Sequence, residues 1–275
     1  MDYLGRLHID RKPGAGVPKW FTAGACVAAV LALSACSSGS GGTVSPSGSA
    51  GTVGTPDPGP TVSLPADPRA AVLAAAGHLG DQSFQLKYTS LTSTAVGAID
   101  PRGNTSGIST SLGDGTTINV RQLGNDVYVE VTGASAGKLH AVAGKWMHVD
   151  TGALPATSAL GPNRNQAAAS AALLRTATAV HLVGARTYQG RVDLSKGSST
   201  LPAGLASMMR SVPFSAVLDP WGRFDSLSYD LDQVVSGAGQ LESSYFQYGA
   251  PIDIPRPAAA ETVPMPAEFE KSIGA

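Results

Sequence analysis

The sequence predicts an α+β domain in which antiparallel strands come first, two or three helices follow, and further antiparallel strands close the domain. Three observations support this order: segments where apolar and polar residues alternate, an alanine-rich segment between them, and Asp-Pro-x-Gly turns that join candidate strands. Alternation with a period of two is typical of a half-buried strand, whereas an alanine-rich run favours a helix. Strands grouped before and after the helices indicate an α+β architecture.

A helix and a strand open the domain. Asp67 suits an N-cap and Pro68 the first helical position, and residues 71–79 favour a helix. Residues 84–89 then alternate Phe, Leu and Tyr with polar residues, which predicts a strand with one apolar face.

A β-hairpin is expected in the middle of the chain. Residues 117–123 and 126–131 both alternate, and the Gly-Asn pair at 124–125 between them is a turn signal. Residues 145–150 form a further short strand.

The second half of the domain carries the predicted helices. We expect helices over residues 165–182 and 201–210 and strands over 186–194, 213–218 and 223–231. The last two strands meet at the Asp-Pro-Trp-Gly turn 219–222, which echoes the Asp-Pro-Arg-Gly turn 100–103. We interpret the pair as two ordinary hairpin turns, although an internal repeat is the alternative.

The first 35 residues have the organisation of an export signal. A basic leader is followed by an apolar, uncharged run over residues 21–33, which is too short to span a bilayer and typical of a signal peptide. The run ends in Leu33-Ser34-Ala35-Cys36, which resembles the lipobox of bacterial lipoproteins. The resemblance implies cleavage before Cys36 and lipidation of its thiol by diacylglyceryl and palmitate-type acyl chains. A short buried helix is the alternative interpretation of the apolar run.

Residues 36–66 are expected to be a lipidated cysteine followed by a flexible tether. The segment is built of Ser, Gly, Thr and Pro with almost no apolar bulk, although a glycosylated stalk would have the same composition. Of the two cysteines in the chain, Cys26 lies in the signal and Cys36 carries the lipid, so the mature domain has no disulfide. We therefore expect a cell-membrane location, on the extracytoplasmic side, through the lipid anchor.

Composition and motifs argue against several classes of function. The net charge is −1 and 14% of residues are charged, which offers no basic field for nucleic acid. The chain contains no His-Glu-x-x-His motif, P-loop or complete dinucleotide glycine fingerprint, and its histidines are scattered. We expect no metal, no cofactor and no catalysis.

One motif favours a different class. Residues 133–137 (Gly-Ala-Ser-Ala-Gly) match the nucleophile elbow of serine hydrolases, with Ser135 as the nucleophile. The match follows a strand, but the residues after it contain two glycines before the next strand, where an elbow requires a helix. In a chain so rich in Gly and Ser the match also arises easily by chance, so a hydrolase is a remote alternative.

Several stretches resemble the LppX/LprAFG lipoproteins of actinobacteria. The stretches are residues 84–88, 127–129, 144–149, 213–224 and 248–255. The resemblance covers most of residues 67–257, which we take as the domain, with residues 258–275 as a C-terminal tail. It implies a half-barrel similar to the LolA and LolB carriers, a curved antiparallel sheet wrapped around the helices. It also implies the binding or transfer of lipids or lipoglycans in the cell envelope.

Alternation places eight apolar residues on one face of the expected sheet. They are Phe84, Leu86, Ile118, Val120, Val127, Val129, Phe214 and Leu218. The resemblance implies that the space in front of them is incompletely filled, so that they wall a cavity for a lipid or lipoglycan. The same alternation would suit a solid core, and a binding or sensory module that presents its surface to an envelope protein is the alternative.

Overall fold

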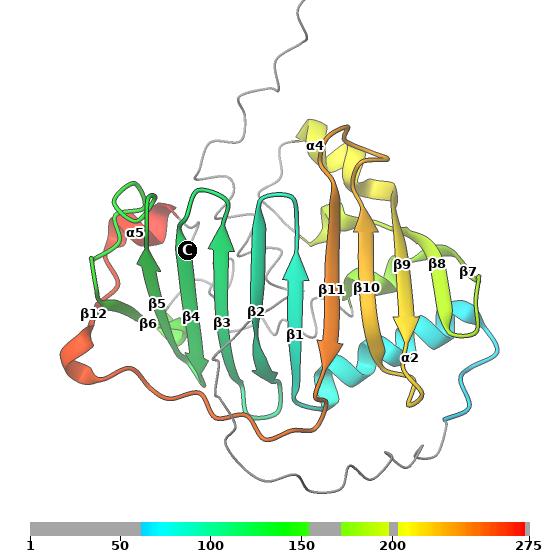
Figure 1. Ribbon diagram of the computed structural model, residues 1–275, viewed down its shortest axis with the longest axis horizontal. Helices are drawn as coiled ribbons and strands as arrows, with labels where there is room; N and C mark the ends of the chain where they lie inside the picture. Colours follow the sequence, from blue (N-terminus) through cyan, green and yellow to red (C-terminus); the bar gives the residue numbers. More distant parts are fainter. Residues whose placement is uncertain (1–61, 154–171, 198–202, 273–275) are drawn as a thin grey trace, which may run out of the picture.

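The structure is a computed structural model that describes residues 62–153, 172–197 and 203–272. Its main element is one sheet of twelve strands (Figure 1). The strands are β1 (Phe84–Thr89), β2 (Ser93–Asp100), β3 (Thr105–Leu112), β4 (Thr117–Leu123), β5 (Asp126–Thr132), β6 (Trp146–Asp150), β7 (Thr178–Leu182), β8 (Thr187–Val192), β9 (Val212–Leu218), β10 (Phe224–Asp230), β11 (Gln240–Phe246) and β12 (Thr262–Pro264). The helices are α2 (Pro68–Asp81), α4 (Ala203–Met208) and α5 (Ala267–Ser272), and four short 3-10 turns are η2 (Thr151–Ala153), η3 (Leu194–Lys196), η4 (Met209–Ser211) and η5 (Ala259–Glu261).

The strand order across the sheet is β12-β6-β5-β4-β3-β2-β1-β11-β10-β9-β8-β7. Every neighbouring pair is antiparallel except β12 and β6, which are parallel. Strand β1 connects the early strands of the chain with the late ones in the sheet, because it pairs with β2 on one side and with β11 on the other. The predicted antiparallel sheet is confirmed: it is one long, mostly antiparallel open sheet with few short helices, and it is consistent with curvature.

Helix α2 begins as the sequence predicts. The side chain of Asp67 accepts a hydrogen bond from the backbone N–H of Arg69 at 3.1 Å, and Pro68 follows at the first helical position. Its buried side chains are mostly small (Ala71, Val72, Ala75, Ala76 and Leu79), which lets the helix lie close to the sheet. Figure 1 shows α2 behind strands β9, β10 and β11.

Both predicted tight turns join strands. The turn 219–222 connects β9 to β10, where Asp219 Oδ1 accepts from the backbone N–H groups of Trp221 and Arg223, each at 2.9 Å. Gly222 has φ +77°, a left-handed conformation that favours glycine. The turn 100–103 connects β2 to β3, and the hairpin β4–β5 turns at Gly124 as expected.

The helix predicted over residues 165–182 is wrong at its C-terminal end, because residues 178–182 are strand β7. Residues 165–171 lie outside the described residues, and helix is present over residues 172–175. The chain leaves the helix at residue 176, and the carbonyls there have tertiary partners: the Arg69 guanidinium donates to the oxygens of Arg175 and Ala177 at 2.6 and 2.9 Å. The chain then pairs with β8 at the edge of the sheet, where Thr178 and Val180 are suited to a strand.

Two domain boundaries differ from the prediction. The predicted C-terminal tail, residues 258–275, contains strand β12, which pairs with β6, and helix α5, whose Phe269 is buried. At the other end, residues 62–66 were predicted as tether. The backbone N–H of Val62 bonds the oxygen of Pro220 at 3.1 Å, and Leu64 packs against the core. The described residues at both ends, 62–66 and 258–272, therefore contact the rest of the fold.

Candidate functional site

The predicted apolar face exists and is continuous across the sheet. Cross-strand pairing aligns one row of side chains on this face, which runs through Val129, Val120, Ile108, Gly97, Leu86 and Tyr245. Successive residues of a strand point to opposite faces, so the partners two positions along each strand share this face. We call it the inner face.

The inner face carries no charged residue on β1 to β5. Its members there are Phe84, Leu86, Tyr88, Ser93, Ala95, Gly97, Ile99, Ser106, Ile108, Thr110, Leu112, Ile118, Val120, Gln122, Val127, Val129 and Val131. The charged residues of the same strands, Lys87, Asp100, Arg121, Asp126 and Glu130, all belong to the opposite face. A surface of this composition suits an apolar partner, because an unpaired charge would be costly to bury against one.

The structure divides the eight predicted residues between two hydrophobic clusters. Four of them, Phe84, Leu86, Phe214 and Leu218, are buried in a first cluster that α2 covers. Ile118, Val127 and Val129 are buried in a second cluster, and half-buried Val120 packs against it. One face therefore carries all eight residues, but they do not form one continuous group.

Short residues occupy the inner face of β2 and β3, next to and partly within the first cluster. On β2 the inner positions include Ala95 and Gly97, and on β3 they include Ser106 and Thr110. Ala95, Ser106 and Thr110 are buried; Ala95 belongs to the first cluster, and the nearby Ile108 is buried without belonging to either cluster. We call Ala95, Gly97, Ser106 and Thr110 the central strip. These four residues occupy little volume. The hydroxyl groups of Ser106 and Thr110 are the polar side-chain atoms among them.

Aromatic rings fill one end of the first cluster. The Phe84 ring centroid lies 5.9 Å from that of Tyr245 and 5.8 Å from that of Tyr248, and Phe224 lies 5.9 Å from Tyr245. The Tyr248 hydroxyl donates to the backbone oxygen of Phe224 at 2.9 Å. Burial raises the pKa of Tyr248 far above its usual value, so this phenol stays neutral and remains a donor. Sequence reasoning did not identify the Tyr245 and Tyr248 rings, although Tyr245 alternates with Ser243 and Leu241 along β11.

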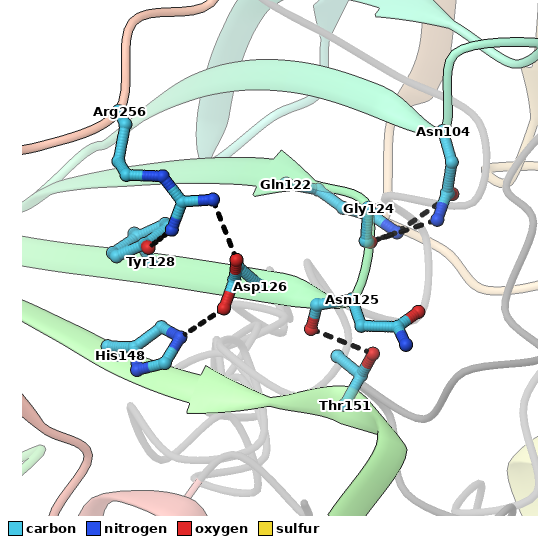
Figure 2. Close-up of polar contacts among 9 residues, drawn as sticks. All are labelled: Asn104, Gln122, Gly124, Asn125, Asp126, Tyr128, His148, Thr151 and Arg256. Carbon is cyan, nitrogen blue, oxygen red and sulfur yellow. Dashed lines mark hydrogen bonds and ion pairs between the residues drawn. The ribbon is translucent and has the colours of Figure 1, made fainter.

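Polar side chains gather instead on the outer face of β5 and β6 (Figure 2). Asp126 accepts from the Arg256 guanidinium at 2.8 Å and pairs with His148 Nε2 at 2.7 Å, and Arg256 also donates to the Tyr128 hydroxyl. The hydrogen bond from Arg256, followed by the one from His148, lowers the pKa of the Asp126 carboxyl. Arg256 comes from the segment 247–258, which Figure 1 shows running along the ends of the strands from β11 toward β12.

The same segment is fixed at two further points. Arg121 Nη1 donates to the oxygen of Pro255 at 2.7 Å, and its guanidinium lies 4.3 Å from the centroid of the Trp146 ring. Ile254 lies against Gly107, where an added Cβ would approach its Cδ1 to 2.7 Å. These contacts stabilise the path of segment 247–258, and sequence reasoning could not find them because the partners lie about 130 residues apart.

Ser135 has a structural environment in the loop after β5. Its hydroxyl donates to Asp114 Oδ2 at 2.6 Å, and its backbone N–H donates to Thr116 Oγ1 at 2.9 Å. The Ser135 bond is the largest cause that lowers the pKa of Asp114. The side chain is buried and the residues that follow form turns, so the motif 133–137 differs from an elbow that presents its serine above a helix.

Within the part of the chain that the structure describes, no group of three or more His, Cys, Asp or Glu side chains could hold a metal ion. None of the helices described is both long enough and apolar enough to cross a bilayer. Cys36 lies outside the described residues. No family model matches the chain, and no curated protein matches it.

Proposed function

We propose that the chain is a membrane-anchored extracytoplasmic lipoprotein that binds or carries lipids or lipoglycans and catalyses no reaction. Its ligand would lie in a hydrophobic cavity on the inner face of a half-barrel, whose sheet wraps around the helices. The observation that carries this proposal is the uncharged inner face, which carries two hydrophobic clusters and the short residues of the central strip.

The central strip is the preferred position for acyl chains. An acyl chain gains about 0.8 kcal/mol for each CH₂ that leaves water, provided that the protein gives it an apolar surface. Ala95 and Gly97 are the smallest residues of the inner face on β1 to β5, so an acyl chain would approach the sheet closely there, with Ile108 as an apolar contact beside it. The hydroxyl groups of Ser106 and Thr110 suit the ester or sugar oxygens where acyl chains meet a headgroup.

The anchor part of the proposal depends on the sequence. Leu33-Ser34-Ala35-Cys36 follows an apolar run of signal-peptide length, and a Ser, Gly, Thr and Pro segment follows the cysteine. A diacylated cysteine holds a protein stably at a membrane because two chains add their burial free energies. The resemblance to the LppX/LprAFG lipoproteins supports both the anchor and the ligand class.

A second candidate function is a solid binding or sensory module that presents its surface to an envelope protein. The full burial of side chains in both clusters, such as Phe224 at 0% and Met147 at 0% exposure, favours it. A core packed in this way leaves few voids larger than a water molecule.

Lipid recovery from matched variants separates the two candidates. We expect mass spectrometry of organic extracts of the purified full chain to find a co-purified lipid or lipoglycan in addition to the acyl chains on Cys36. Ala95→Leu, which fills the central strip, should lower the recovered ligand per protein about tenfold, a loss of about 1.4 kcal/mol in binding. Ala98→Leu is the control, because Ala98 lies on the same strand but on the outer face.

The proposal fails if the wild-type protein yields no ligand and takes up none from added lipid micelles. It also fails if both variants retain the wild-type amount of ligand. Thermal unfolding of each variant checks that the protein is folded, so that lost binding is not lost structure.

A further inference from the structure

Exposed apolar side chains gather at one end of the sheet. Val62, Leu182, Val183 and Trp221 are 50%, 51%, 48% and 42% exposed. Leu182 ends β7, Val183 follows it in the β7–β8 turn, Trp221 lies in the β9–β10 turn, and Val62 is the first described residue. We call these four residues the rim.

Hydrogen bonds hold the three segments of the rim together. The backbone N–H of Val62 donates to the oxygen of Pro220 at 3.1 Å, which joins the start of the described chain to the β9–β10 turn. The backbone N–H of Leu218 donates to the oxygen of Arg186, and Arg186 Nη1 donates to the oxygen of Asp219, each at 2.9 Å. These bonds join the β7–β8 turn to the β9–β10 turn, so the rim is one surface.

The indole of Trp221 is held in place while its surface stays exposed. The backbone N–H of Trp221 is bonded to Asp219, and the Arg223 guanidinium lies 4.7 Å from the centroid of the indole ring. Arg223 is itself paired with Asp219 at 2.7 Å. A ring fixed in this way loses little conformational entropy when a partner covers it.

The entry point of the chain identifies the partner. Cys36 precedes Val62 by 26 residues (62 minus 36), and the segment between them has the composition of a flexible linker. Such a linker has a root-mean-square length of about 30 Å, which keeps the rim at an effective concentration of the order of millimolar near the anchored bilayer. A surface of weak intrinsic affinity then suffices, and tryptophan is the side chain that most favours the membrane–water interface.

We propose that the rim docks on the bilayer that holds the lipid anchor, with Trp221 at the level of the lipid headgroups. This inference rests on the anchor of the proposed function. It orients the domain, with the β7–β8 and β9–β10 turns toward the membrane and the β1–β2 turn away from it. The strand register places Leu91, in the β1–β2 turn and 69% exposed, at the opposite end of the sheet.

Tryptophan quenching tests the orientation in the protein as it exists. The mature lipoprotein is reconstituted into vesicles of phosphatidylcholine and phosphatidylglycerol, with or without bromine on the lipid acyl chains. Trp20 precedes Cys36, so the mature chain contains Trp146, which is buried, and Trp221. We expect brominated vesicles to quench the wild-type fluorescence and to leave that of Trp221→Phe unchanged.

A matched pair of variants locates the contact. Val183→Glu places a charge on the rim and should abolish the quenching of Trp221, because a carboxylate is costly at the bilayer interface. Leu91→Glu places the same charge on a more exposed residue at the other end, and quenching should stay at the wild-type level.

Three results would overturn the docking, and they differ in what they mean for the proposed function. A protein that fractionates with vesicles through its acylated Cys36, yet shows no quenching of Trp221, overturns the docking and leaves the proposed function intact. A Cys36 that mass spectrometry finds unmodified overturns the anchor, and the docking inference with it. Equal quenching in the Val183→Glu and Leu91→Glu proteins also overturns the docking.

Discussion

The two hydrophobic clusters lie toward opposite edge strands of the twelve-stranded sheet, and they bury their side chains in different ways. We call the part of the sheet with the first cluster the first end, and the part with the second cluster the second end. The first cluster combines α2 with strands from early and late parts of the chain, β1 and β2 with β8 to β11. The second cluster is smaller, comes mainly from β4 to β6 and the loop after β5, and is completed by Met265 and Phe269 near the C-terminus. The first end therefore depends on non-local packing throughout, whereas the second is a set of local hairpins closed by one late helix.

Truncating one buried phenylalanine at each end should give the largest difference. Phe224 is fully buried in the first cluster, so Phe224→Ala should cost about 3–5 kcal/mol in the free energy of unfolding. Phe269 is equally buried, but α5 is a six-residue helix near the end of the chain that can detach without unfolding the sheet. We expect Phe269→Ala to cost less, about 1–3 kcal/mol.

Urea unfolding followed by circular dichroism measures both costs, and hydrogen exchange shows where protection is lost. Phe269→Ala should lose protection in β6 and β12 and retain it in β9 and β10. Equal costs and a uniform loss of protection would show that the two ends unfold as one unit.

A glycine in the loop of the second end should have the next largest effect. Gly133 has φ +89°, and a Cβ there would overlap the backbone oxygen of Gly115. Gly133→Ala should therefore cost about 1–3 kcal/mol, because both the strained backbone and the contact oppose it. Gly137→Ala is the control in the same motif, since no atom lies within 4 Å of its added Cβ. A Gly133→Ala protein with wild-type thermal stability would contradict this account of the motif as a packed loop.

The contrast between the two ends also explains what could be predicted from the sequence. The hairpin β4–β5 and the turn 219–222 carry strong local patterns, and both were predicted correctly. Strands β2 and β3 bury Ala95, Ser106 and Thr110, whose short side chains give no apolar alternation; only the turn 100–103 indicated them. Strand β7 was missed because it continues an alanine-rich run that favours a helix. Its pairing with β8, and the bonds from Arg69 to the carbonyls just before it, are not visible in a local pattern.

The sequence predicts which residues share the inner face, but it does not predict how they are grouped into clusters. Period-two alternation places all eight predicted residues on the inner face. Their division into two clusters depends on the short residues of β2 and β3 and on which helix covers each end. The burial of Phe269 in what was predicted as a tail depends on the parallel pairing of β12 with β6, which joins residues more than 100 positions apart.

The smallest expected effect is the pH dependence of the contact that ties segment 247–258 to the second end. The hydrogen bonds from Arg256 and His148 lower the pKa of Asp126 in the folded protein. A carboxyl whose folded pKa is depressed adds stability at all pH values above its unfolded pKa, and loses it as pH falls through the folded pKa. The unfolded value is about 3.9, so the contribution should be constant near pH 7, should begin to fall below about pH 4, and should be lost as pH passes through the lower pKa of the folded protein.

Replacing the Arg256 guanidinium measures the contribution of its pair with Asp126 to stability. Arg256→Gln should lower the melting temperature slightly at pH 7, because Arg256 is more than half exposed and its pair with Asp126 is screened by solvent. The difference from the wild type should shrink as pH falls below about 4, and should vanish once Asp126 is protonated in the folded wild type as well. Lys271→Gln, which removes the exposed pair with Glu268, is the control and should have no measurable effect. A melting-temperature difference for Arg256→Gln that stays constant from pH 7 to pH 3 would mean that segment 247–258 is held by Ile254 and Pro255, and that the charge of Asp126 contributes nothing.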